Sequence, residues 1–355
     1  MRKPVASMLL TFCLLLAVAT KLLAIDFVPV NQADVLVVTH ANLLTPNWVP
    51  GMVGAWETEF LAQKQTQGYT VALYEIFDGM DQYDIRDYLE NNQGHFRFIC
   101  IIGEARRPGI DPPEPFDVPF TSFAEGNIVP LWREVVQTFW QAYDGLYVIE
   151  NDRGYIENID SVFIGRIPAA NSNEILIYLA KADSYISIEH RFPEWSKTIL
   201  EAVNDVTSFG NGSSGPYIQA FWDSWEAEFP AGWPVTRFAT STGPPTEEGR
   251  AFQFENFLDG THCGIIHVVG TTGCDYLLAE WYYGDSQYNF TNFEYLPFVL
   301  GMSCHIGAFD RYWEGVENEC VVEKLLFHPY GGIIAAIAPT GSTLLPQNCV
   351  FPIKF

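Results

Sequence analysis

Short apolar runs rich in β-branched residues alternate with stretches of helical periodicity along most of the chain. Near-continuous apolar runs are typical of strands buried on both faces of a parallel sheet, and the stretches between them are typical of the helices that cover it. In the first half we expect strands at residues 34–39, 69–76, 96–103 and 161–167, and helices at residues 53–67, 84–91 and 171–186. The pattern predicts an α/β fold.

The alternation restarts after about residue 190, so we expect two subdomains, residues 25–190 and residues 191–355. In the second subdomain the expected strands are residues 198–203, 235–238, 263–273, 331–338 and a run that begins at residue 296, and the expected helices are residues 217–228, 247–258 and 317–327. Residues 104–130 and 274–295 are expected to form loops. The chain stops soon after the last strand, at Phe355, and we interpret this ending as a truncation.

The helix expected at residues 171–186 has a clear start and a clear apolar face. Asn171, with Glu174 three positions later, resembles a capping box. An apolar stripe follows at helical spacing, formed by Ile175, Leu179, Ala182 and Ile186. We expect this stripe to face the core.

Two neighbouring strands of the second subdomain end in small residues. They are CGIIHVVGTTG, residues 263–273, and the run in LPFVLGMSCHIGAFD, residues 296–310. In parallel α/β sheets, side chains converge on a crevice at the carboxyl ends of the strands. Cys304 stands at such an end, between Ser303 and Gly307, which makes its thiol a candidate nucleophile.

The segment VLGMSCHIGAFD resembles the nucleophile segment of the gingipain-type cysteine peptidases of the caspase-like clan, and GIIHVVGTTG resembles the strand that carries their histidine. ADVLVVTH, QGYTVALYEI and RFICIIGEA also resemble segments of that family, over residues 34–343 in all. The resemblance implies a caspase-like αβα sandwich with mostly parallel sheets and two subdomains. It also implies an endopeptidase that forms an acyl-enzyme.

The resemblance assigns roles to individual residues of this chain. Cys304 takes the place of the nucleophile, and Thr271 stands where the family has its catalytic histidine. Threonine cannot act as a general acid or base near neutral pH. The remaining assignments are Gly270, Thr272 and Gly273 to the oxyanion-binding turn, Trp281 and Asp310 to substrate binding, and Asp144 to a loop or cation site.

Other histidines are candidates for the missing base. His267 lies on the same strand, four residues before Thr271, and this places it about 13 Å back in the sheet at 3.3 Å per residue. A hydrogen-bonded core histidine is the alternative interpretation of His267, and a surface position is the alternative for His305. His40 ends the first strand, and His262 precedes its strand at the opposite edge.

The first 24 residues have the layout of a secretory signal peptide. Arg2 and Lys3 precede an apolar stretch that ends in small residues, with Ala19 and Ala24 as possible cleavage sites. We therefore expect a secreted or cell-surface protein without a stable membrane segment after cleavage.

Composition excludes some partners and leaves others open. Cleavage after Ala24 removes three basic residues and no acidic one, which changes the net charge from −24 to −27, and such a surface repels nucleic acid. The mature chain has cysteines at positions 100, 263, 274, 304, 320 and 349, without a zinc-binding pattern. One or two disulfides are compatible with export, including one between Cys274 and Cys304 that would silence the thiol. The resemblance leaves calcium open as a cofactor.

Three functions therefore stay open, and one of them, a non-peptidase exported structural module, would leave Cys304 at its strand end unexplained. The first is a secreted cysteine peptidase with Cys304 as nucleophile and a peptide or protein as substrate. The second is a catalytically inactive homologue that lacks the histidine and binds a peptide or partner.

Overall fold

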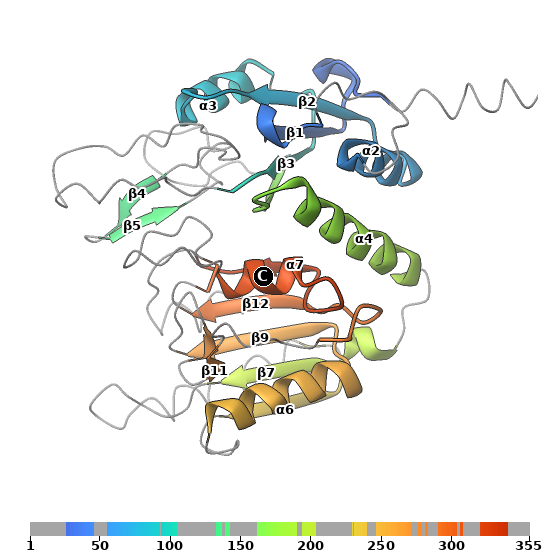
Figure 1. Cartoon of the computed structure of the whole chain (residues 1–355), viewed down its shortest axis with the longest axis vertical. Coiled ribbons are helices and arrows are strands. Elements are labelled where there is room, and N and C mark those ends of the chain that lie inside the picture. Colours follow the sequence, from blue (N-terminus) through green and yellow to red (C-terminus); the bar gives the residue numbers. More distant parts are fainter. Residues whose placement is uncertain are drawn as a thin grey trace, which may run out of the picture.

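The computed structural model describes residues 26–45, 55–92, 94–104, 133–136, 139–142, 162–189, 194–203, 229, 231–239, 246–270, 276–278, 281–282, 290–303, 306–307 and 320–339. Two parallel sheets lie one below the other in Figure 1, with helix α4 (Ser172–Glu189) between them. The expected α/β fold with mostly parallel sheets is confirmed.

The first sheet has the strand order β2-β1-β3-β6. Its strands are β1 (Val35–His40), β2 (Val71–Ile76), β3 (Phe98–Ile102) and β6 (Phe163–Ile167), and all of their pairings are parallel. Helix α3 (Gln82–Asn91) covers one face, where Ile85 and Leu89 pack against alternate strand residues. Helices α2 (Trp56–Thr66) and α4 cover the other face. Both faces are thus buried, which explains the continuous apolar strands.

The second sheet has the order β13-β12-β9-β7-β8, also with parallel pairings. Its strands are β7 (Ile199–Val203), β8 (Val235–Ala239), β9 (Ile265–Gly270), β12 (Phe298–Ser303) and β13 (Ala335–Ile337), and its described helices are α6 (Glu247–Gly260) and α7 (Val321–Phe327). The helix expected at residues 217–228 lies outside the described residues. The last strand is shorter than expected, because residues 331–334 are buried in the core but do not join the sheet. Helix α7 likewise begins later than expected.

Two antiparallel ribbons were not expected from the sequence. One pairs β4 (Arg133–Val136) with β5 (Phe139–Ala142), and the other pairs β10 (Tyr276–Leu278) with β11 (Trp281–Tyr282). The loop expected at residues 274–295 is wrong where β10 and β11 form. Each strand has only two to four residues, too few to show an alternating pattern. The remaining short elements are 3-10 helices, namely η1 (Val30–Gln32), η2 (Ala41–Leu43) and η4 (Glu194–Lys197).

One hydrophobic core joins the two sheets. It includes Val37 of β1, Leu179 of α4, Val268 of β9 and Leu325 of α7, all at most 1% exposed. Helix α4 packs against α2 on one side and α7 on the other. Among the described helices, none is long and apolar enough to cross a membrane.

Candidate active site

The carboxyl ends of β9 and β12 lie side by side. The two strands pair in parallel from Ile265 and Phe298 up to Gly270 and Ser303, which face each other as the last pair. Both arrows point to the same edge of the sheet in Figure 1. The next residues in the chain are Thr271 and Cys304. The register therefore brings together the strand ends that lead to the candidate nucleophile, Cys304, and to Thr271, the position predicted to correspond to the family's histidine.

The backbone around this edge is tightly packed. A Cβ on Gly301 would lie 2.8 Å from Cγ2 of Ile306, so the chain that leaves β12 returns directly onto its own strand. Ile306 is fully buried, and the N–H of Gly307 donates to the carbonyl of Pro339 at 3.0 Å. Glycine at position 301 permits this close approach. Residues 304 and 305 thus connect two fixed points of the structure.

Several predicted site residues lie outside the described part of the chain. They are Cys304, Thr271, Thr272, Gly273, Asp310, Asp144, Cys274 and His305. Gly270 is the last residue of β9, as placed above. Trp281 begins β11, which packs beside α6, while its partner β10 packs beside β9. The ribbon that carries Trp281 is therefore a neighbour of the strand that leads to Thr271.

His267 lies in the middle of β9, three residues before Gly270, and its side chain is fully buried. Burial lowers its pKa to about 3, so the imidazole is neutral over the physiological range. Its register partner on β7 is Glu201, which is itself buried and forms an ion pair with Arg237 of β8 at 3.2 Å. His267 thus belongs to a polar row across the sheet, behind the strand end.

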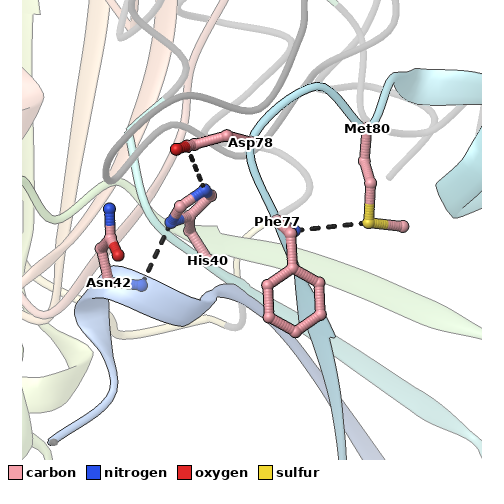
Figure 2. A network of polar contacts seen from close by, with 5 residues as sticks. All are labelled: His40, Asn42, Phe77, Asp78 and Met80. Carbon is pink, nitrogen blue, oxygen red and sulfur yellow. Dashed lines mark hydrogen bonds and ion pairs between the residues drawn. The ribbon is translucent and has the colours of Figure 1, made fainter.

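His40 is the last residue of β1, and Figure 2 shows its contacts. Its Nδ1 accepts a hydrogen bond from the N–H of Asn42 at 3.1 Å, which caps η2, and its Nε2 lies 3.0 Å from Oδ1 of Asp78. The hydrogen-bond network assigns the proton to Nε2. Burial lowers the pKa of His40, and the Asp78 carboxylate opposes that change. With both ring nitrogens engaged, His40 fixes the end of β1.

His262 precedes β9 at the opposite edge of the sheet, as expected. Its Nδ1 lies 2.9 Å from the carbonyl of Leu258, and its ring stacks on Tyr295 with centroids 3.6 Å apart. Its φ of 59° lies in the left-handed region, which ends α6 sharply before β9 begins. The residue shapes this turn.

Two other thiols differ from a reactive cysteine. Burial raises the pKa of Cys100 to about 11 and raises that of Cys263 further. Neither forms a disulfide in the structure. Within the described residues, no group of three His, Cys, Asp or Glu side chains is arranged to hold a metal ion.

Lys181 was missed by the reasoning from sequence. This residue of α4 is fully buried, and its ammonium donates to backbone carbonyls of the second half of the chain. The available signal was a lysine next to the apolar stripe of α4, at position 181 between Leu179 and Ala182.

The structure of this chain resembles solved structures, and its sequence matches a protein-family model. The structure superposes on a complex of the pro- and mature domains of RgpB from Porphyromonas gingivalis with a TM-score of 0.54, at 13% identity, covering 89% of this chain and 66% of that one. It superposes on the Arg-specific cysteine proteinase gingipain R with a TM-score of 0.54, at 14% identity, covering 91% and 67%. A third structure, described as a protease, gives 0.58 at 12% identity, covering 91% and 62%.

The chain thus spans about two thirds or less of the length of these structures, and at such identities the likeness establishes the fold, which is that of the gingipains. No curated protein sequence matched significantly. The model of peptidase family C25 matches residues 29–352. Since this match covers most of the chain, the protein belongs to peptidase family C25, the gingipain family.

Proposed function

We propose that this chain is a secreted gingipain-like cysteine endopeptidase in which Cys304 is the nucleophile. The observation that carries the proposal is the register of β9 and β12, whose last pair is Gly270 and Ser303. Membership of a peptidase family supports a protein or peptide substrate. The division into a signal peptide at residues 1–24 and subdomains at 25–190 and 191–355 is part of the proposal.

The proposed reaction follows from a thiolate at the end of β12. The Cys304 thiol gives up its proton, its sulfur attacks the scissile carbonyl carbon, the carbon–nitrogen bond breaks, and the leaving amine takes up a proton in place of the one released. Water then hydrolyses the thioester and restores the thiol. Backbone N–H groups of the segment Gly270–Gly273 are the proposed donors to the oxyanion. Trp281 and Asp310 are proposed to contact the substrate.

The proposal assigns no residue as the general base of this reaction. Thr271 occupies the histidine position of the family and cannot transfer the proton near neutral pH. His267 is neutral but buried behind the strand end, and His40 has both ring nitrogens engaged. These three observations favour a second candidate function, an inactive peptidase homologue that binds a peptide or partner.

The deciding experiment is covalent labelling of the purified mature protein with peptidyl electrophiles that carry basic, acidic or apolar side chains at P1. An active peptidase is labelled rapidly at one site, and Cys304→Ala abolishes the labelling. Cys100 and Cys263 do not compete, because burial raises the pKa of both thiols. An unlabelled native chain that gains reactivity in Thr271→His would refute the peptidase and support the binding protein.

A further inference from the structure

A buried lysine of the first half of the chain contacts the second half. Lys181 of α4 is fully buried, and its Nζ donates to the carbonyls of Leu325 at 2.9 Å, Leu326 at 2.8 Å and Ile333 at 3.3 Å. An ammonium has three donors, so these three carbonyls match its capacity. The cation of one half is therefore held by the backbone of the other.

The three carbonyls fix the connection between α7 and β13. Leu325 and Leu326 belong to the last turn of α7, where carbonyls lack partners within the helix and where a cation is favourable. Ile333 lies just before β13. Asn292 holds the same connection, because its Oδ1 accepts from the N–H of Gly332 and its Nδ2 donates to the carbonyl of Gly332. The start of β13 is thus held from two sides.

Strand β13 and the residues after it contact β12 and the residues that follow β12. It pairs with β12 from Phe298 to Leu300. Beyond β13, a Cβ on Gly307 would lie 2.9 Å from the Cβ of Ala338, and the carbonyl of Pro339 accepts from the N–H of Gly307. Ala338 also lies against Gly301, at 3.3 Å from a Cβ placed there. The segment after β13 therefore contacts Gly301 and Gly307, which precede and follow Cys304 in the chain.

We propose that Lys181 is a positioning residue for residues 301–307, the segment that includes Cys304. It acts through the α7–β13 connection and through the contacts of residues 338 and 339 with Gly301 and Gly307. The proposal rests on the proposed function, in which Cys304 is the reactive thiol. It means that the first half of the chain contributes to the geometry of the site through the interior of the protein. Small displacements of a reacting group are costly, on the order of a hundredfold in rate for 1 Å.

The test compares Lys181→Met with a matched control. Methionine keeps an unbranched side chain in the core but removes the three donors. Gln63→Met is the control, because Gln63 of α2 is also buried and donates to the carbonyl of Leu179 at 2.7 Å, but this bond stays within the first half. Lys181→Met loses three buried bonds from side chain to backbone, and Gln63→Met loses one. The bonds made by Lys181 reach the second half.

Two measurements are made on the native chain and both variants. The first is the concentration dependence of Cys304 labelling by a peptidyl electrophile. Lys181→Met is expected to lower the maximal rate on the order of tenfold or more while the half-saturating concentration changes less than about twofold, and Gln63→Met to change neither. Equal losses in the two variants would overturn the proposal, because the effect would then be general destabilisation.

The second measurement is hydrogen exchange, which needs no activity. Lys181→Met is expected to speed exchange in residues 320–339 and in residues 301–307, beyond any change in Gln63→Met. Faster exchange confined to α4 and α7, with residues 301–307 unchanged, would overturn the proposal. An unlabelled native chain would count against the proposed function alone, and exchange would still decide the role of Lys181.

If Lys181→Met does not fold, the native chain can still be used to test whether residues 301–307 are coupled to α7 and β13. Exchange is then followed at increasing concentrations of mild denaturant. The amides of α7, of β13 and of residues 301–307 are expected to open together, with one common dependence on denaturant. Opening of residues 301–307 at lower denaturant than α7 would overturn the proposal.

Discussion

The two sheets of this protein have the same strand order but different ends. Read from one edge, the order is β2-β1-β3-β6 in the first sheet and β8-β7-β9-β12-β13 in the second. In both, the chain starts at an inner strand, adds a strand on one side and then continues on the other. By position in this order, β3 corresponds to β9 and β6 corresponds to β12.

Side chains close the carboxyl end of the first sheet. The Thr39 hydroxyl donates to the carbonyl of Ile102 at 2.9 Å, and Nη1 of Arg166 donates to the carbonyl of Gly103 at 3.0 Å. His40 binds the N–H of Asn42 and pairs with Asp78. Polar groups at this edge are therefore used to hold the strands and the first turns in place.

The second sheet ends in small residues at the corresponding place. Its last pair is Gly270 and Ser303, followed in the chain by Thr271 and Cys304, whereas the last pair of β3 and β6 is Ile102 and Ile167. The comparison teaches that one topology serves two purposes. The first sheet ends in polar side chains that hold the strand ends and the first turns, and the second ends in small residues at the place where the proposed nucleophile follows. The first sheet then acts on the second through α4 and Lys181.

The largest expected effect is a change in the labelling rate of Cys304, which follows the carboxyl end of β12 in the second sheet. In a chain that lacks a base, Thr271→His restores a general acid and base and is expected to raise the labelling rate of Cys304 by about 10²–10⁴-fold, the usual contribution of such a group, whereas an active native peptidase gains little. The measurement is the rate of covalent labelling at neutral pH. Thr272→His is the control, because neighbouring side chains point in different directions. An equal gain in both variants would contradict the alignment of Thr271 with the family's histidine.

Two glycines, one in each half of the chain, differ in how closely other atoms approach them. A Cβ on Gly264, just before β9, would lie 2.0 Å from the carbonyl oxygen of Ser196, whereas a Cβ on Gly165 of β6 meets no described atom within 4 Å. Gly264→Ala is expected to lower the free energy of unfolding by about 3 kcal/mol, and Gly165→Ala to change it by less than about 1 kcal/mol. Denaturant unfolding measures both. A similar cost at both positions would contradict this difference.

Lys181→Met is expected to destabilise the protein by about 1–3 kcal/mol at pH 7, because buried carbonyls lose their donors. Burial lowers the pKa of Lys181 to about 7 from 10.5. Between these values the unfolded chain binds a proton that the folded chain has released, so the stability of the native protein rises with pH. The variant lacks this rise. Denaturant unfolding from pH 6 to pH 10 is therefore expected to show a gap that widens with pH, and a constant gap would contradict the lowered pKa.

Acid unfolding distinguishes the buried histidines of the two sheets, His40 and His267. Both have a lowered pKa in the folded state, that of His267 to about 3, so each contributes stability that is lost as the pH falls below about 6.5. His267→Gln is expected to reduce the pH dependence of the unfolding free energy by up to about 1.4 kcal/mol per pH unit. His40→Asn, which can still cap η2, is expected to reduce it less. Unfolding at pH 4–7 measures both slopes, and a larger change in His40→Asn would reverse this assignment.

Much of the fold was predictable because its signals are local. Continuous apolar runs located the nine strands of the two parallel sheets, and the capping residues of α4 located its start, where the N–H of Glu174 donates to Oδ1 of Asn171 at 3.1 Å. The short ribbons β4–β5 and β10–β11 were not predictable in this way, because strands of two to four residues have no period to detect.

For the candidate site, too, some features were predictable from the sequence and others only from the tertiary structure. The motif around Cys304 and the threonine at position 271 are properties of the sequence alone, and they predicted the family and raised the question of activity. The tertiary structure decided that Gly270 and Ser303 are neighbours, that His40 is a cap and that Lys181 joins the two halves. The physical reason is distance along the chain. Lys181 and the carbonyl of Leu325 are 144 residues apart, and no periodicity within α4 reveals which backbone its ammonium will meet.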